Sequence, residues 1–295
     1  MANVSRFSVD GVFWRKAAAF GAQHGPGWWI RWSPPIIGAA AAAILPGPRA
    51  SVVRNLHLIR GEKGPVRDVT EVAQTFAAYA GCLAEILAAG SKNAGTPDAV
   101  LVGRKHLDRA AALGRGILVA TIHSGGWELV GPLLASYRRS KLVMVMEGER
   151  DAGSRAIQDA ARRKNGLEVV HVGEDPLSSL PILRHLREGH TVAMQIDRVP
   201  RGMRGVDVRL FGGPFRMPLG PLRIAQVSGA PLVPIFAART GYRRYVIEAG
   251  PPVVLSRKAD DAEVARAAQS MANVMGEFLR DHPTQWFHFH GASPP

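Results

Sequence analysis

The sequence predicts an α/β domain built on a single mixed, mostly parallel sheet that is flanked by helices. Between about residue 100 and residue 281, short runs rich in β-branched residues alternate with segments of helical spacing, a pattern typical of strands joined by crossover helices. The chain has 295 residues, of which 46% are hydrophobic and 21% charged, so it can bury a large core and has the composition of a globular protein.

The first part of the chain is expected to be helical. Residues 1–48 are rich in Trp, Gly and Ala. We interpret them as an N-terminal helical extension that precedes one domain over residues 49–295. Apolar residues at three- and four-residue steps predict helices over residues 49–59 and 68–89.

The alternating part follows in order. Strands are predicted over residues 100–102, 117–122, 142–146, 168–172, 191–196, 231–237 and 245–249. Helices are predicted over residues 108–113, 127–137, 154–165, 176–187, 218–227 and 261–281, three of them followed by a glycine that suits a helix C-terminus. Glycines and prolines punctuate residues 195–225, so much of that stretch is expected to be loop.

The charge of the chain predicts an anionic partner. The formal net charge is +13 and, with seven lysines, thirty of the 37 cations are arginine. Arginine binds phosphate and carboxylate through two parallel hydrogen bonds, so nucleic acid, an anionic bilayer or a phosphorylated substrate would suit it. A GC-rich genome is an alternative source of the arginine excess, but it does not explain the net charge.

The N-terminal apolar run is interpreted as peripheral to a membrane. Residues 35–45 are too few to span a bilayer, which needs roughly twenty apolar residues, and no secretory signal is evident. The preceding WWIRW, residues 28–32, suits a membrane interface. A buried helix whose tryptophans cover a core is the alternative.

One candidate site lies where a predicted buried strand ends, in GILVATIHSGGWELVG. His123 ends the strand, Ser124, Gly125 and Gly126 allow a tight turn and close approach of another molecule, and Glu128 falls in the first helical turn. The Glu128 carboxylate can fold back onto one ring nitrogen of His123, leaving the other to take a proton from a hydroxyl. Backbone N–H groups of the turn could receive an oxyanion.

The alternative for this stretch is structural, since a histidine at a strand end and a glutamate in a first helical turn are common features. A serine nucleophile is disfavoured because HSGGW lacks the G-x-S-x-G pattern.

A second cluster follows the strand predicted at residues 191–196. Asp197 and Arg198 come directly after it, and carboxyl ends of neighbouring parallel strands carry functional residues. Six arginines lie between Gln195 and Ala225, which suggests a dock for a phosphate on a lipid head group or a phosphopantetheine carrier. A solvated basic surface is the alternative. Arg198 is the strongest candidate of the six.

Five blocks of the sequence, in order, resemble a known family. HSGGWE resembles the H-x-x-x-x-D/E motif of the lysophospholipid and glycerol-phosphate acyltransferase superfamily. VVRNLHLI (residues 52–59), AMQIDR, VRLFGGPFRMPLGPLRIAQVSGAPLVPIFAAR (residues 208–239) and HPTQWFHFH (residues 282–290) resemble blocks of the lipid A biosynthesis lauroyl/myristoyl acyltransferases. The resemblance covers roughly residues 50–290, and the related phosphatidylinositol mannoside acyltransferases share its architecture.

The resemblance implies a glycerol-phosphate acyltransferase-like fold and transfer of a fatty acyl group to a hydroxyl, or an amine, of a membrane glycolipid or phospholipid. The donor would be acyl carrier protein (ACP) or CoA as a thioester, with no cofactor, metal or covalent acyl-enzyme. His123 would be the base and Glu128 its orienting partner. The other residues expected to bind substrate are Ser124, Gly125, Gly126, Arg150, Asp197, Arg198, Gly212 and Gly213.

The implied location is the cytoplasmic face of a bacterial inner membrane, on an anionic lipid surface, with the chain peripheral or monotopic. The sequence departs from the family at Phe287 and His288, where the family often has a nearby Trp, and in its short apolar run. These departures leave open the acceptor, whether a lipid A precursor, another glycolipid such as a phosphatidylinositol mannoside, or a specialised metabolite.

Other functions are also open. A thioester or lipid hydrolase would use His123 to activate water, and a non-enzymatic basic protein would bind membrane or nucleic acid, although no nucleic-acid partner is expected. His288 and His290 would face one side of a strand, yet no third metal ligand is near in the sequence. Cys82 lies in an apolar run and is interpreted as a core residue.

Overall fold

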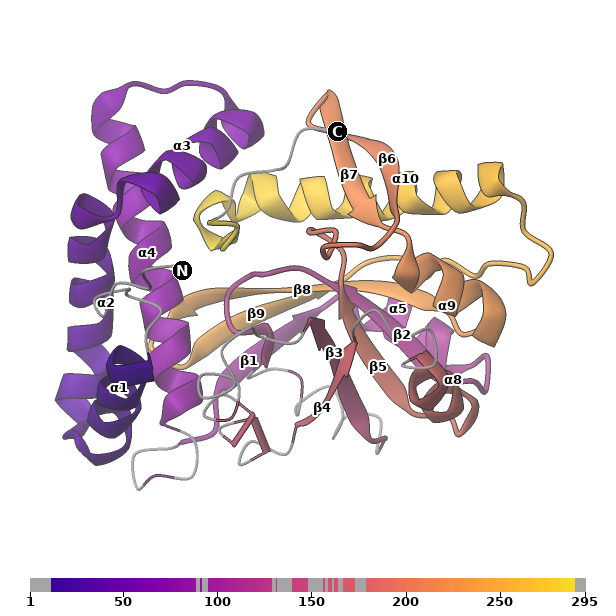
Figure 1. The fold of residues 1–295 in the computed structure, drawn as a ribbon, viewed down its shortest axis with the longest axis horizontal. Helices are drawn as coiled ribbons and strands as arrows, with labels where there is room; N and C mark the ends of the chain where they lie inside the picture. Colours follow the sequence, from indigo (N-terminus) through magenta and orange to yellow (C-terminus); the bar gives the residue numbers. More distant parts are fainter. Residues whose placement is uncertain are drawn as a thin grey trace, which may run out of the picture.

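The computed structural model describes residues 12–88, 91, 95–128, 131, 140–147, 156, 159–160, 162–163, 167–172 and 179–289, with side chains from residue 16 onward except at 147 and 172. A seven-stranded sheet forms the centre of the molecule, with helices on both of its faces (Figure 1). The helices α1–α4 stand at one edge of the view, and the C-terminal helix α10 lies along the sheet.

The sheet has the strand order β1-β9-β8-β2-β5-β3-β4. Every neighbouring pair is parallel except β8 with β9. The sheet is therefore mixed and mostly parallel, which confirms the predicted fold class. The strands are β1 (Asp98–Val102), β2 (Ile117–Thr121), β3 (Leu142–Glu147), β4 (Glu168–Val172), β5 (Thr191–Gln195), β8 (Leu232–Gly241) and β9 (Arg244–Ala249).

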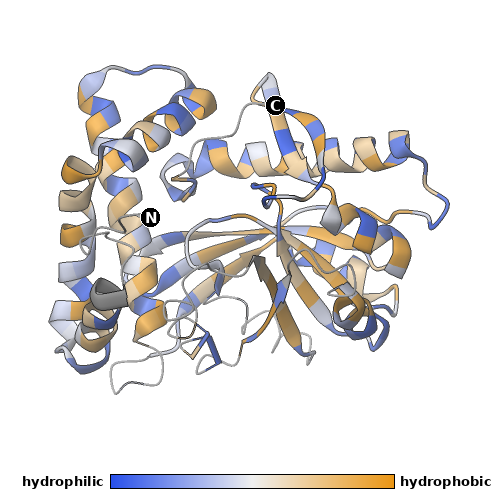
Figure 2. Cartoon of the chain, in the orientation of Figure 1, coloured by the Kyte–Doolittle hydropathy of each residue, from blue (hydrophilic) through white to orange (hydrophobic). Residues whose placement is uncertain are grey.

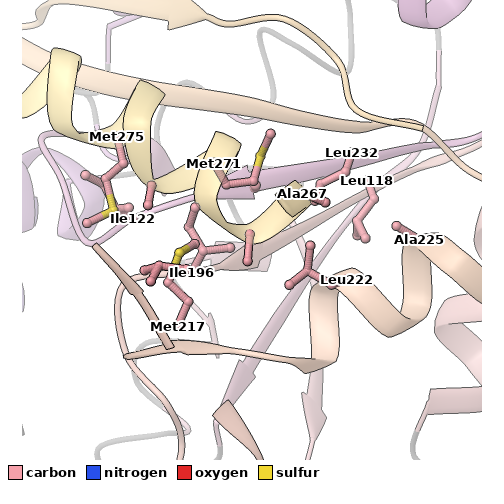
Figure 3. Close-up of a cluster of buried hydrophobic side chains, with 14 of the residues drawn as sticks. Leu118, Ile122, Ile196, Met217, Leu222, Ala225, Leu232, Ala267, Met271 and Met275 are labelled. Atoms are coloured by element: carbon pink, nitrogen blue, oxygen red, sulfur yellow. The ribbon is translucent and has the colours of Figure 1, made fainter. Parts of the chain in front are cut away.

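The core divides between the two faces of this sheet. Along β2, Leu118 and Ala120 face one cluster, whereas Ile117 and Val119 face the other, as the two-residue period of a strand requires. The first cluster packs beneath α10 (Asp261–Asp281) through its Met271 (Figure 3). Because both faces are covered, β2 is buried at all five positions and its sequence is a continuous apolar run.

Each helix on the sheet overlaps a predicted one, although α5 begins four residues before its predicted start. They are α5 (Arg104–Ala111), α8 (Leu180–Arg187), α9 (Gly220–Ser228) and α10. Helix α10 has the predicted bounds, and its N-cap Asp260 accepts a hydrogen bond from the Glu263 backbone N–H at 2.7 Å, which satisfies a group that would otherwise lack a partner. The helices predicted at 127–137 and 154–165 lie largely outside the described residues.

The expectation of a loop over residues 195–225 is wrong in its middle. β6 (Gly205–Leu210) and β7 (Gly213–Pro218) form an antiparallel hairpin. Val208 and Phe215 face the core, while Asp207 and Arg209 face outward, a two-residue alternation that the glycines and prolines obscure. Phe211 and Gly212 make the turn, both with positive φ, 52° and 83°, as a two-residue type I′ hairpin turn requires.

The N-terminal helices lie against the long helix α4 (Pro65–Leu87). They are α1 (Val12–His24), α2 (Gly27–Ile44) and α3 (Pro46–Arg60), and α2 and α4 lie side by side (Figure 1). A Cβ at Gly38 would come within 2.4 Å of the Phe76 backbone oxygen, so glycine permits this close packing. The division of the chain at residue 48 stays a prediction.

Among the described residues, no single helix meets the length and hydropathy expected of a membrane span. Helices α2 and α3 meet that test only as a pair, and their axes bend by 98° at the break between them. In Figure 2 the central strands are mostly apolar, whereas α10 alternates apolar and polar residues.

Candidate active site

The centre of the site is a contact between His123 and Asp197, each placed just beyond the carboxyl end of a central strand. His123 follows β2 and Asp197 follows β5, which are parallel neighbours with Thr121 opposite Gln195. The side chains therefore emerge at the same edge of the sheet. His123 Nδ1 lies 2.9 Å from Asp197 Oδ1.

Asp197 is fully enclosed and accepts three hydrogen bonds. Besides the His123 ring, the His123 backbone N–H donates to Oδ2 at 3.3 Å and the Trp286 indole N–H donates to Oδ2 at 3.0 Å. Burial by itself raises the pKa of Asp197, but attraction and hydrogen bonding from His123, with smaller contributions from His288 and Trp286, lower the pKa well below its ordinary value. Asp197 is therefore a carboxylate at neutral pH.

These contacts fix the protonation of the His123 ring. Because ionised Asp197 can only accept, Nδ1 must carry the proton and donate it. Neutral His123 then has an unprotonated Nε2, the form in which the ring can act as a base. The His123 side chain is 27% exposed, whereas that of Asp197 is 0% exposed. His123 can therefore contact a ligand, whereas the Asp197 carboxylate is shielded from solvent.

The expected contact between Glu128 and His123 is not found. Instead Glu128 receives two hydrogen bonds from Arg162, Nε to Oε2 at 3.0 Å and Nη2 to Oε1 at 2.9 Å. Arg162 also contacts Asp159, which accepts from His171 of β4. Glu128 thus ties the segment after the turn to the β4 side of the sheet, and Asp197 occupies the orienting position beside His123.

The residues between His123 and Trp127 pack against the protein itself. The Ala237 backbone N–H donates to the hydroxyl of Ser124, which is 1% exposed. A Cβ at Gly125 would lie 2.3 Å from Gln285 Oε1, and one at Gly126 would lie 2.0 Å from the Tyr245 ring. Glycine is required at both positions for packing, and a role of their backbone N–H groups toward substrate stays a prediction.

A buried polar cluster supports the turn from below. Glu85 of α4 accepts from Arg239 Nη2 at 2.7 Å and Nε at 3.0 Å, and from the Tyr245 hydroxyl. Burial, with the nearby Cys82 and Glu85, raises the pKa of Tyr245, so its hydroxyl donates. Burial also raises the pKa of Cys82 to about 12, which keeps it a thiol and agrees with its predicted place in the core.

The first and last sequence blocks that resemble the family, residues 52–59 and 282–290, meet at this site. Phe287 donates its backbone N–H to the His123 carbonyl at 2.7 Å, and Asn55 of α3 donates its side-chain amide to the His288 carbonyl at 2.8 Å. The His288 ring stacks on Trp286 with 5.3 Å between centroids. Residues 286–288 form only an isolated bridge and no strand, so the strand geometry that a His288 and His290 metal pair would need is not found there, and His290 lies outside the described residues.

A small apolar cavity of about 20 Å³ lies beneath the turn, against the face of the sheet that carries Val119. This volume has room for about one water molecule and is far below the range for small-molecule sites, about 300–1,000 Å³. Its lining comes from the strands and from the segment after the turn: Val119, Thr121, Trp127, Gly131, Leu142, Met144, Ala193, Ile235, Phe236 and Ala237.

The remaining predicted binding residues are more dispersed. Arg198 has a buried Nε, and Gln195 a buried Nε2, with no hydrogen-bond partner among the described residues. Gly212 and Gly213 belong to the β6–β7 turn, where Gly212 provides the positive φ. Arg150 lies outside the described residues. Contact of Arg198, Gly212 and Gly213 with substrate stays a prediction.

Within the described part of the chain, no group of three or more His, Cys, Asp or Glu side chains is arranged to hold a metal ion.

Sequence reasoning missed Trp286, Glu85, Arg239, Tyr245 and Gln285 as residues that build the site. Gln285 and Trp286 lie within the block HPTQWFHFH, and Arg239 ends the block of residues 208–239, so these three had a signal in the sequence. Glu85 and Tyr245 are 160 residues apart in the chain, and no spacing rule joins residues so distant.

Curated relatives are phosphatidylinositol mannoside acyltransferases. The one from Mycobacterium tuberculosis is 30% identical over 191 residues, which is 64% of this chain and 58% of that protein. The chain thus spans less than two thirds of this relative's length. The one from Mycolicibacterium smegmatis is 26% identical over 256 residues, 84% of this chain and 80% of that protein.

Among solved structures, the 1-acyl-sn-glycerophosphate acyltransferase PlsC from Thermotoga maritima is 13% identical and superposes with a TM-score of 0.39, covering 91% of this chain and 98% of that one. The sequence profile described as bacterial lipid A biosynthesis acyltransferase matches residues 26–292, nearly the whole chain. The chain belongs to the bacterial lipid A biosynthesis acyltransferase family.

Proposed function

We propose that this protein transfers a fatty acyl group from an acyl-ACP or acyl-CoA thioester to a hydroxyl of a membrane glycolipid or phospholipid. The observation that carries the proposal is the buried Asp197 carboxylate, which holds the partly exposed His123 ring with Nε2 free. The family of the chain supports it. The names of the relatives make phosphatidylinositol mannosides one acceptor to test.

The proposed step is a direct displacement at the thioester carbonyl. His123 Nε2 takes the proton of the acceptor hydroxyl as its oxygen attacks the acyl carbon. The tetrahedral intermediate then collapses and the carbon–sulfur bond breaks. The leaving thiolate takes the proton from Nε2 of His123. The products are an ester of the acceptor and a free thiol. The thioester supplies the activated acyl group, so the step uses no further cofactor.

Asp197 has two tasks in this step. It keeps the proton of the neutral ring on Nδ1, and it stabilises the imidazolium that forms when Nε2 is protonated. Its three donors keep it ionised and fixed, because a buried carboxylate with fewer partners would gain a proton or move. Glu128 acts indirectly, because its hydrogen bonds to Arg162 hold the start of the segment after the turn.

Arg198 is the proposed contact for a phosphate of the donor or the acceptor. It follows Asp197 directly, and its buried Nε has no hydrogen-bond partner in the described structure. A buried donor without a partner costs free energy, and a bound phosphate oxygen would remove that cost.

We also propose that α2 holds the protein on an anionic membrane surface, at the cytoplasmic face of the inner membrane. One face of α2 is buried at Ile30, Gly38 and Ala42, and this helix packs on α4 through Gly38 and Ala42. The opposite face carries Trp28, Trp32 and Ile36 at four-residue steps, 65%, 58% and 65% exposed. An exposed apolar stripe with aromatic residues suits the interfacial region of a bilayer, and the net charge of +13 suits anionic lipid.

Vesicle binding tests the membrane proposal. The variant Trp32→Ser/Ile36→Ser should bind vesicles that contain anionic lipid at least about tenfold more weakly than wild type, since it removes two large apolar contacts. Val227→Ser is the matched control, because Val227 is 48% exposed on α9. Equal binding by the wild type and the double variant would contradict the proposal.

Acyl transfer itself is tested by mass spectrometry. The purified full-length chain is incubated with acyl-CoA or acyl-ACP and a bacterial lipid extract, with phosphatidylinositol mannosides in a parallel reaction. A lipid with one added acyl chain, formed by wild type and absent with His123→Ala, is expected. Free fatty acid without any acylated lipid would identify a hydrolase instead. Equal turnover by His123→Ala would contradict the proposed base.

A further inference from the structure

We propose that Asn55 is a positioning residue for the reaction and acts on His123 and Asp197 through the C-terminal segment, residues 286–288. This inference rests on the proposed acyl transfer and names a residue, distant in sequence from both members of the pair, on which that transfer depends. Asn55 lies on α3 and is 4% exposed. Its side-chain amide donates a hydrogen bond to the His288 carbonyl oxygen at 2.8 Å, across 233 residues of chain.

The C-terminal segment holds both members of the His123–Asp197 pair. The Trp286 indole N–H donates to Asp197 Oδ2 at 3.0 Å, and the Phe287 backbone N–H donates to the His123 carbonyl oxygen at 2.7 Å. The first contact sets the hydrogen bonding of the carboxylate, and the second holds the backbone from which the imidazole ring extends. A displacement of the C-terminal segment therefore changes the geometry of the base and of its partner together.

Aromatic rings and Asn55 anchor the C-terminal segment on the side away from the turn. The Tyr79 ring of α4 contacts the Phe287 ring edge-on, with 5.5 Å between centroids, and the Phe215 ring lies 6.3 Å from Trp286. Ring pairs are favourable over a broad range of centroid distances, about 4.5–7 Å, whereas a hydrogen bond weakens steeply outside a narrow range of distance and angle. The Asn55 hydrogen bond therefore fixes the segment more closely than the rings do.

Helix α3 gives Asn55 a firm support. Val52 and Leu56 lie on the buried side of α3 and belong to one apolar cluster with Phe76 of α4. Both are nearly inaccessible to solvent, at 2% and 1% exposed. Leucine has nearly the shape of asparagine, so Asn55→Leu keeps this packing and removes the donor to the His288 carbonyl. The perturbation is thus directed at the C-terminal segment and not at the helix.

The expected effect is on turnover. Asn55→Leu should lower kcat by about 10–100-fold, because a misplacement of about 1 Å can cost about 100-fold. The KM should be nearly unchanged, since Asn55 is buried within its own chain and the lost contact is not one with substrate. If Asn55 acts through Trp286, the double variant Asn55→Leu/Trp286→Phe should lose less than the product of the two single losses.

The experiment compares transfer by these variants at a temperature where circular dichroism shows each to be folded. Gln226→Met is the matched control. Gln226 of α9 is 8% exposed and donates its side-chain amide to the Ala259 carbonyl oxygen at 2.8 Å, a bond of the same kind in a part of the fold that packs on α8 and α10. The control should retain the kcat of wild type.

Nuclear magnetic resonance with isotope-labelled tryptophan gives a second readout that needs no transfer. The indole N–H signal of Trp286 is assigned by its loss in Trp286→Phe. Because that N–H donates to Asp197, its chemical shift reports the position of the C-terminal segment. The signal should move in Asn55→Leu and stay in place in Gln226→Met.

A lower kcat with unchanged KM, a non-additive double variant and a moved Trp286 signal would support the inference. A kcat in Asn55→Leu equal to that of Gln226→Met would overturn it, because the amide would then have a structural role only. Full multiplication of the two losses, or an unmoved Trp286 signal, would also overturn it. Absence of transfer in wild type would refute the proposed function. A moved signal would then still uphold the link from Asn55 to Asp197, and an unmoved signal would refute that link as well.

Discussion

Replacing Gly126 with alanine tests whether the His123 turn depends on the buried cluster beneath it. Gly126 has a φ of +75°, and a Cβ there would lie 2.0 Å from the Tyr245 ring. That ring is 1% exposed, and its hydroxyl donates to Glu85. The ring therefore cannot withdraw without breaking a buried hydrogen bond.

The magnitude follows from two separate costs. Alanine in the left-handed region costs about 1–2 kcal/mol relative to glycine, and insertion of a methyl group into a packed core costs about 1–3 kcal/mol more. The free energy of unfolding should therefore fall by about 2–5 kcal/mol. Because the same turn carries His123, turnover should also fall at temperatures where the variant is folded.

Urea unfolding followed by circular dichroism measures the change. Gly220→Ala is the control, since Gly220 begins α9 and has nothing within 4 Å of a built Cβ. In a double-mutant cycle, Tyr245→Leu should recover part of the loss in Gly126→Ala, because it removes the ring that the methyl group meets. Equal stability of Gly126→Ala and Gly220→Ala would refute this reasoning.

Three further predictions concern the groups around Asp197 and Glu85. Trp286→Phe removes the indole donor to the Asp197 carboxylate. This should lower the free energy of unfolding by about 1.5–3 kcal/mol and lower kcat, with little change in KM. Unchanged denaturation and kinetics would exclude that role of Trp286. Glu85→Gln leaves the buried Arg239 without its ionic partner and should cost about 3–5 kcal/mol by the same denaturation assay; a smaller cost than that of the exposed Glu188→Gln would contradict it. The pKa of Asp197 in the folded protein lies below its ordinary 3.8, so between these two pKa values the unfolded chain binds more protons than the folded one. The stabilisation by ionised Asp197 is therefore fully present above pH 3.8 and is lost as the pH falls toward the pKa of the folded state. Acid titration of wild type should therefore show a loss of stability that Asp197→Asn lacks, and parallel curves would count against the assigned pKa direction.

The sheet and its helices could be predicted because their signals are local. Apolar runs such as Ile117–Thr121 and the periodic pattern of Asp261–Asp281 are each contained within one element. The β6–β7 hairpin was less visible. Its turn uses Phe211 at a positive φ, where a sequence is expected to place Asn, Asp or Gly, and its strands are short and interrupted by glycine and proline.

Within the site, the sequence predicts the residues better than their contacts. His123, Asp197 and Glu128 could be identified because they follow strands or lie in a known motif. Their pairing depends on strand order, since Asp197 reaches His123 only because β5 lies directly beside β2. Glu128 is close to His123 in sequence, but a buried Arg162 provides two hydrogen bonds that His123 could not.

The most direct test of the account compares acyl transfer by Asp197→Asn and Glu128→Gln at a temperature where both are folded. Asparagine presents an amide N–H to His123 Nδ1, where Asp197 presents a carboxylate oxygen. This favours the His123 tautomer that carries its proton on Nε2, and that tautomer cannot act as the base. We expect kcat to fall by about 10³-fold or more in Asp197→Asn, close to the fall in His123→Ala, and much less in Glu128→Gln. Near-normal transfer by Asp197→Asn, together with a loss in Glu128→Gln equal to that of His123→Ala, would contradict it.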